Sequence, residues 1–211
     1  MNYAWRFHQI MHQIAQGKDS VISLPTYQHK LDSLFPSNAM KMNFVTNHDE
    51  NSWNGTVTEK FGNNSKVFVV LTYTMPGMPL IYSGQEAGLN KRLKFFTKDT
   101  VNWDNKELVP FYQSLNKLKH GNVALLNPPF GGTFQNIKNS EPKKVFSFLR
   151  TKDNAKVLVI ANLTASQVSV SLNDDMALGT YKDAFTGQES MVKKAEPIQL
   201  DAFGYKVLEV K

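Results

Sequence analysis

The sequence contains no cysteine, which excludes a disulfide framework and a thiolate metal site. Because disulfide-free proteins occur on both sides of membranes, the compartment stays open. Arginine, the side chain that best binds phosphate and guanine in a bidentate manner, occurs only at Arg6, Arg92 and Arg150. The net charge of +6 therefore comes mainly from scattered lysines, without a block of five like charges. We expect no nucleic-acid partner.

Long apolar runs are also absent, and none approaches the ~18 residues of a membrane span. The longest candidate, residues 66–82, is split by Pro76 and Gly77, so no membrane partner is expected. The first residues lack the charged-then-apolar order of a secretory signal and instead have the period of an amphipathic helix. Met1 is therefore expected to be an internal position of a longer protein.

The first 121 residues alternate between helical and strand patterns. Apolar residues three and four apart predict helices, and short apolar runs predict buried parallel strands. In the order helix, strand, helix, strand, helix, the expected elements span residues 3–17, 42–45, 56–73, 78–82 and 108–121. Thr56 and Glu59, at the start of the third element, have the spacing of a capping box. Residues 20–38, between the first two elements, are expected to form a loop. This order indicates βα units, but two strands cannot form a parallel sheet alone, so further strands are expected upstream.

From residue 122 the pattern changes. Prolines and glycines between Asn127 and Gly132 indicate a linker, and no helical period follows. Strands are expected at 144–150, 156–163, 167–172, 180–185 and 203–210. This spacing is typical of a small antiparallel sandwich. The sequence therefore predicts two domains, residues 1–121 and 122–211.

A group of polar residues follows the first expected strand. Asn47, His48 and Asp49 lie where that strand meets its loop, and barrels of parallel strands build their active sites at such ends. Taken alone, an Asn-His-Asp string more often caps the following turn. Trp53, on the same loop, either stacks on a sugar face or fills a gap in the core. Amide, imidazole, carboxylate and indole groups together suit a polyhydroxylated ligand.

Two histidines have a spacing that metal sites use. His8 and His12 are one helical turn apart, but neither a third ligand nor an intervening Glu accompanies them. A surface pair is the more common arrangement, so we expect no metal site here.

Three sequence segments carry a resemblance to a known family. They are FVTNHDENSWNGT at 44–56, MPGMPLIYSGQEAGLNKRLKFF at 75–96 and NWDN at 102–105. In this order they resemble the α-amylase family of retaining glycoside hydrolases, whose seventh barrel strand ends in Asn-His-Asp and whose eighth carries a Pro-Leu-Ile-Tyr-x-Gly-Gln-Glu-like segment. The resemblance implies the last βα units of a (β/α)8 TIM barrel, strands 7 and 8 with flanking helices, followed by an antiparallel β-sandwich domain.

The same resemblance implies roles for individual residues. Asp49 would be the transition-state stabiliser that holds hydroxyls of the sugar at the cleavage point, and His48 its neighbouring donor. Asn47, Trp53 and Glu86 would bind substrate. Glu86 would have an orienting or structural role rather than transfer a proton, because an ionised surface carboxylate is the ordinary state. Retaining hydrolysis needs two further carboxylates ~5 Å apart, a nucleophile and a general acid. The family carries these on strands that would precede Met1, so this chain alone is expected to be inactive.

The implied function is that of the C-terminal portion of a hydrolase acting on α-1,4-glucans such as starch and maltodextrin. Its partners would be an α-glucan or maltooligosaccharide and the missing N-terminal barrel portion. No cofactor is expected in this chain, and the family's calcium sites lie mostly in that N-terminal portion. Two alternatives remain open: a transglycosylase or isomerase of the same family, and a non-catalytic glucan-binding relative.

Overall fold

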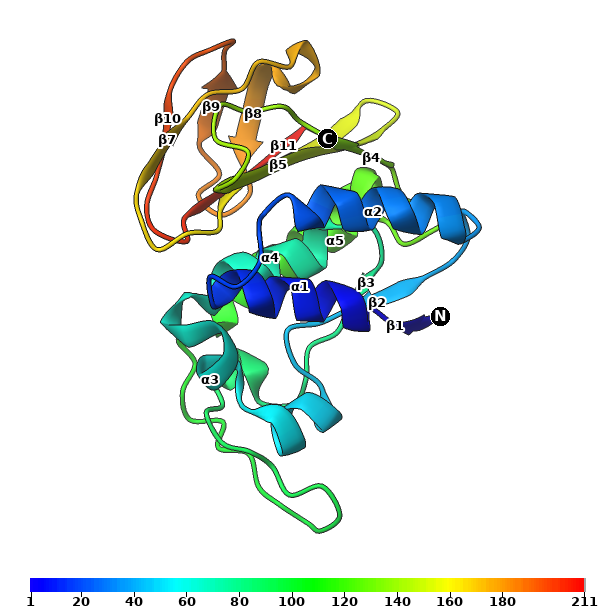
Figure 1. Ribbon diagram of the computed structural model, residues 1–211, viewed down its shortest axis with the longest axis vertical. Helices are drawn as coiled ribbons and strands as arrows, with labels where there is room; N and C mark the ends of the chain where they lie inside the picture. The colour runs from blue at the N-terminus through cyan, green and yellow to red at the C-terminus, as the bar shows by residue number, and fades with distance from the viewer. Residues whose placement is uncertain (211) are drawn as a thin grey trace.

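The computed structural model describes residues 1–210, which form a mixed α/β part and an antiparallel β part (Figure 1). The α/β part contains a parallel sheet in the order β1-β2-β3. Its strands are short: β1 is Asn2–Tyr3, β2 is Lys41–Asn43 and β3 is Met78–Pro79. The two strands expected in this part are present, although each is shorter than expected. β1 is an additional strand, where a helix was expected, because two residues are too few to show a period of two.

The α/β part also contains five α-helices. They are α1 (Trp5–Ala15), α2 (Ser23–Leu34), α3 (Val57–Phe61), α4 (Ser65–Thr74) and α5 (Val109–Gly121). The expectation of a loop over residues 20–38 was wrong, because α2 occupies most of it. This helix buries only Leu24 and Gln28, so its sequence carries almost no apolar stripe.

The helical region after β2 agrees closely with the sequence. The Thr56 hydroxyl accepts from the Glu59 amide, and the Glu59 carboxylate accepts from the Thr56 amide, which confirms the capping box. The helix expected over residues 56–73 is divided in two by the 3₁₀ turn Gly62–Asn64. α4 then runs to Thr74, directly before Pro76 and Gly77.

The second part contains eight strands. They are β4 (Thr133–Asn136), β5 (Val145–Lys152), β6 (Ala155–Asn162), β7 (Val168–Val170), β8 (Gly179–Asp183), β9 (Glu189–Val192), β10 (Ile198–Leu200) and β11 (Tyr205–Val210). Six form an antiparallel sheet in the order β4-β5-β6-β11-β8-β9, and β7 pairs with β10. The expected sandwich is present. The sequence did not predict β4, β9 and β10, which are only three or four residues long.

The six-stranded sheet is covered on both faces. On one face, Phe148, Val159 and Val207 pack in the same cluster as residues of α1, α4 and α5. On the other face, residues such as Leu158 and Leu208 pack against β7 and β10. Side chains of a strand alternate between faces, so each long strand contributes to both cores. In Figure 1, α4 and α5 lie between α1 and this sheet.

A buried arginine also joins the two parts. Arg150 of β5 donates from Nη1 to the Thr74 carbonyl oxygen at 2.9 Å and from Nη2 to the Gly132 carbonyl oxygen at 3.0 Å. Burial lowers the pKa of Arg150 to about 10, so the guanidinium remains charged at neutral pH. The end of α4 and the start of β4 are thus held by one side chain.

Within residues 1–210, no helix is long and apolar enough to cross a bilayer.

Candidate active site

The residues singled out in the sequence lie at one end of the parallel sheet. β2 runs toward Asn47, and β3 runs in the same direction toward the long segment 80–108. In Figure 1 this segment extends away from the body of the molecule on the same side as the turn after β2. Both connections therefore meet at the carboxyl end of the strands, where parallel sheets bind ligands.

Asn47 shapes the turn that follows β2. Its Oδ1 accepts from the Glu50 amide at 2.8 Å, and its backbone oxygen accepts from the Asn51 amide at 2.9 Å. Asn47 is 1% exposed, and this hydrogen bond caps the start of the following helical turn. Its Nδ2 is buried and has no hydrogen-bond partner within residues 1–210. A substrate-binding role for Asn47 stays a prediction.

The turn continues as a short π-helix, Glu50–Asn54. The Gly55 amide donates to the Glu50 carbonyl oxygen at 2.9 Å, one residue further than in an α-helix, and Gly55 ends the turn with φ of +130°. Such wide turns are rare and are frequently found at functional sites.

His48 and Asp49 lie side by side at the start of this turn. Their side chains are 49% and 41% exposed, and His48 Nε2 is 3.5 Å from Asp49 Oδ1. No hydrogen bond within residues 1–210 occupies the Asp49 carboxylate, which leaves its oxygens free to accept from a ligand. The His48 ring lies between Tyr3, at 6.4 Å, and Phe95, at 5.7 Å.

Trp53 faces solvent rather than the core. Its side chain is 56% exposed, so the core-filling alternative was wrong. Its ring contacts two phenylalanines of the segment after β3, with centroid distances of 5.3 Å to Phe95 and 6.1 Å to Phe96. Together with His48 these rings form an aromatic surface beside Asp49.

Glu86 lies apart from the other candidates. It belongs to the 3₁₀ turn Gln85–Ala87 and is partly buried, so the expected surface carboxylate was wrong. Its Oε2 is buried without a hydrogen-bond partner. Burial raises the pKa of Tyr73 and Tyr112, and the negative charge of Glu86 raises both further.

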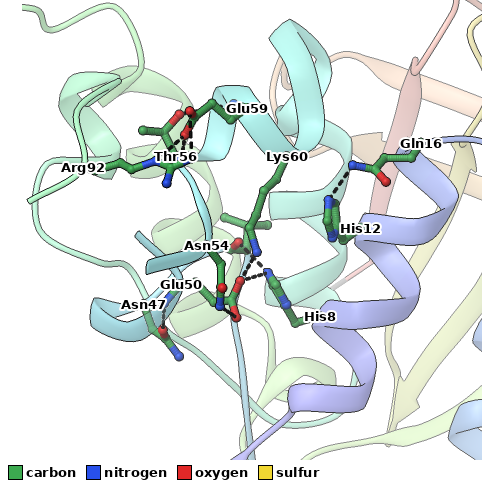
Figure 2. A network of polar contacts seen from close by, with 11 residues as sticks. His8, His12, Gln16, Asn47, Glu50, Asn54, Thr56, Glu59, Lys60 and Arg92 are labelled. Carbon is green, nitrogen blue, oxygen red and sulfur yellow. Dashed lines mark hydrogen bonds and ion pairs between the residues drawn. The ribbon is translucent and has the colours of Figure 1, made fainter. Parts of the chain in front are cut away.

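A network of buried polar side chains lies behind the turn (Figure 2). Glu50 forms an ion pair with Lys60 of α3, and its Oε1 accepts from Asn54 Nδ2 at 3.0 Å. His8 of α1 lies with Nε2 3.8 Å from Glu50 Oε2 and 3.1 Å from the Val45 carbonyl oxygen. Sequence reasoning did not pair Glu50 with Lys60, because the two residues lie on different elements and no single helical or strand period relates them.

His8 is not part of a surface pair. It is 4% exposed, and burial, followed by the charges of Lys60 and His12, lowers its pKa to about 3. The neutral ring donates from Nε2 to Val45. His12 instead pairs with Gln16. Within residues 1–210, no group of three His, Cys, Asp or Glu side chains is placed to hold a metal ion.

A cavity of about 440 Å³ lies elsewhere, between α2 and the segment 128–134. Two residues that line it are Lys41, the first residue of β2, and Pro76, which precedes β3, so the cavity is at the opposite end of the parallel strands. None of the five candidate residues lines it.

Comparison with known proteins agrees with this geometry. Residues 1–123 match the model of the α-amylase catalytic domain, and residues 134–207 match that of the maltogenic amylase C-terminal domain. The chain belongs to the α-amylase family. The predicted family is thus confirmed.

Curated relatives include the α-amylase MalA of Haloarcula japonica, 23% identical over 197 residues, covering 87% of this chain and 28% of MalA. Neopullulanase 2 of Thermoactinomyces vulgaris is 25% identical over 205 residues, covering 93% of this chain and 34% of that protein. The chain therefore spans about a third or less of these curated relatives.

Solved α-amylases share the fold. The maltogenic α-amylase AmyB from Thermotoga neapolitana superposes with a TM-score of 0.82 at 21% identity, covering 98% of this chain and 50% of AmyB. An α-amylase from Lactobacillus plantarum gives 0.76 at 20% identity, covering 99% and 47%.

Proposed function

We propose that this α-amylase family chain is the C-terminal portion of a glycoside hydrolase that acts on α-1,4-glucans by a retaining mechanism. The observation that carries the proposal is the exposed Asp49 carboxylate, unoccupied by other hydrogen bonds and beside His48 at the carboxyl end of β2. In this proposal β2 and β3 are strands 7 and 8 of a TIM barrel, and β1 is the strand before them. The N-terminal barrel portion is then the partner that completes the site.

Asp49 is proposed to stabilise the transition state. Its free oxygens would accept charge-assisted hydrogen bonds from sugar hydroxyls, and such bonds strengthen as the ring approaches the oxocarbenium-like state. His48 would donate a further hydrogen bond to the same sugar. The nucleophile and general acid would lie in the N-terminal portion, so the chain alone would not turn over.

The neighbouring side chains suit a glucan substrate. Trp53, with Phe95 and Phe96, offers apolar ring faces on which a sugar can stack. Two structures of one solved relative support this substrate class, since AmyP was crystallised with maltose and its E221Q variant with maltotriose. Asn47, in the turn after β2, and Glu86, in the segment after β3, would also take part in binding the substrate.

The test is Asp49→Asn in the full-length protein. We expect a turnover number at least a hundredfold lower, because neutralising the carboxylate removes several kcal/mol of transition-state stabilisation. Asp153→Asn makes the same chemical change in the exposed turn between β5 and β6 and should leave turnover unchanged. Near-normal turnover of Asp49→Asn would contradict the role given to Asp49.

Two alternatives use the same residues. A transglycosylase or isomerase would need Asp49 equally, but from maltotetraose it would give longer or rearranged products that hydrolysis does not form. A non-catalytic glucan-binding relative would lack an Asp and a Glu at the ends of the fourth and fifth barrel strands. Product analysis and the upstream sequence therefore separate the three.

A further inference from the structure

Two opposite charges are buried directly behind the turn that carries Asp49. Glu50 and Lys60 are 6% and 8% exposed and form an ion pair. Removing two charges from water is costly, and an apolar pair of similar size is often equally or more stable. The stability of the fold therefore gives no strong reason to have charges here, and their contacts indicate another role.

These contacts converge on Glu50, the residue after Asp49. Its two carboxylate oxygens bind different groups: Oε1 accepts from Asn54 within the turn, and Oε2 pairs with Lys60 of α3. His8 approaches the same Oε2 from α1. In Figure 2 the side chains of His8 and Lys60 both point toward Glu50. The turn is thus held from its own far end by Asn54 and from α3 by Lys60, and the neutral His8 ring of α1 lies against the same carboxylate.

We propose that Glu50 and Lys60 are positioning residues that fix the orientation of Asp49 toward the substrate. The proposal rests on the function proposed above for Asp49. Apolar side chains would fill the same space but would let the wide turn rotate, whereas ionic hydrogen bonds have preferred directions. Because misplacing a group by about 1 Å can cost about a hundredfold in rate, small rotations of the turn matter.

The experiment uses the full-length protein with Glu50→Gln and Lys60→Met, each alone and combined with Asp49→Asn. We expect each single variant to lower kcat at least tenfold while KM changes less than threefold. In the Asp49→Asn background the same changes should lower kcat less than twofold, because they act through Asp49. Lys60→Arg keeps the charge and should recover at least a third of the wild-type kcat.

Lys119→Met is the matched control. Lys119 is also buried, but its Nζ donates to the Gly77 carbonyl oxygen before β3, at the opposite end of the strands. This variant should lose stability while keeping kcat within twofold of wild type. If Glu50→Gln fails to fold, Asn54→Ala tests the same point, because Asn54 is exposed and its loss removes only the bond to Glu50 Oε1. We expect it to lower kcat at least threefold without a change in Tm.

The outcomes separate the two proposals. If Asp49→Asn lowers kcat a hundredfold but the Glu50, Lys60 and Asn54 variants stay within twofold of wild type, the positioning role is refuted and the function of Asp49 stands. The role is also refuted if the Glu50 and Asp49 effects on kcat simply multiply. If Asp49→Asn itself retains its turnover, the proposed function fails.

Discussion

Lys119 is a buried cation without a carboxylate partner in its hydrogen bonds. Its Nζ donates to the Gly77 carbonyl oxygen at 2.9 Å, and burial, followed by the charge of Arg150, lowers its pKa to about 7. In the unfolded chain the same group keeps its proton to about pH 10.4. Between these values the unfolded chain binds more protons, so the free energy of unfolding should rise with pH.

We therefore expect the full-length protein to become more stable from about pH 7 to pH 9.5, measured by urea unfolding at several pH values. Lys60, whose pKa burial also lowers, contributes with the same sign. Above pH 10 the trend should reverse, because burial raises the pKa of Tyr27 to about 12. Lys119→Met should remove much of the slope, whereas Lys117→Met, an exposed neighbour on α5, should not. Equal slopes in both variants would contradict this account.

Single residues could be predicted from the sequence where position along the chain decides their environment. His48 and Asp49 are such residues in their placement, since the sequence put them after a parallel strand, whereas their role at a ligand site came from the family resemblance and stays a prediction. His8 and Glu50 are not, because their environment comes from each other across 42 residues and from Lys60. Neither Trp53 nor Glu86 could be assigned a burial state before the segment after β3 was placed.

At the scale of elements, the parallel strands depend on a close approach at Gly77. This residue has φ of +128°, and a Cβ atom here would lie 2.5 Å from the Lys41 carbonyl oxygen and 2.9 Å from Asn43 Nδ2. The short strand β3 can therefore pair with β2 only if residue 77 has no side chain.

Gly77→Ala should lower the free energy of unfolding by about 2 kcal/mol or more, through the clash and the strained backbone. Gly17→Ala is the control, since Gly17 also has positive φ, +67°, but has no atom within 4 Å of the added methyl group. It should cost only about 1 kcal/mol. Both are measured by chemical unfolding of the full-length protein, and equal losses would show that the contact with β2 is unimportant.

Elements with a strong local signal were predicted well, and weakly patterned ones were not. The capping box of α3 and the long strands β5, β6 and β11 follow from local chemistry and apolar runs. α2 and β1 owe their form to tertiary contacts: α2 has a narrow buried face, and β1 exists because it pairs with β2.

At the scale of the whole molecule, the two predicted domains share a core. Every residue of α4 from Val67 to Thr74 is buried, and this helix packs in one cluster with Phe148 and Val159 of the sheet. The sequence pattern changes at residue 121, but one hydrophobic core contains residues from both sides of this position. Sequence periodicity could not reveal this, because it shows which residues are buried and not what covers them.

Residues 1–121 expressed alone should consequently aggregate or remain molten. The fragment would expose the face of α4 and α5 that the sheet covers, together with unpaired edges of the parallel strands. Near-UV circular dichroism, dye binding and thermal unfolding would measure this, with the full-length protein as the reference. A sharp cooperative melt of the fragment would show that its core is sufficient without the sheet.

The link through Arg150 gives the two parts a mechanical relationship. Its guanidinium binds the last carbonyl oxygen of α4 and a backbone oxygen just before β4. It therefore links these two segments directly, in addition to the covalent chain between them. A force on the β-sheet is transmitted to the helices through that side chain and through the packed face of the sheet, as well as through the covalent linker. The six-stranded sheet therefore stabilises the α/β part through side-chain contacts and is not joined to it by the linker alone.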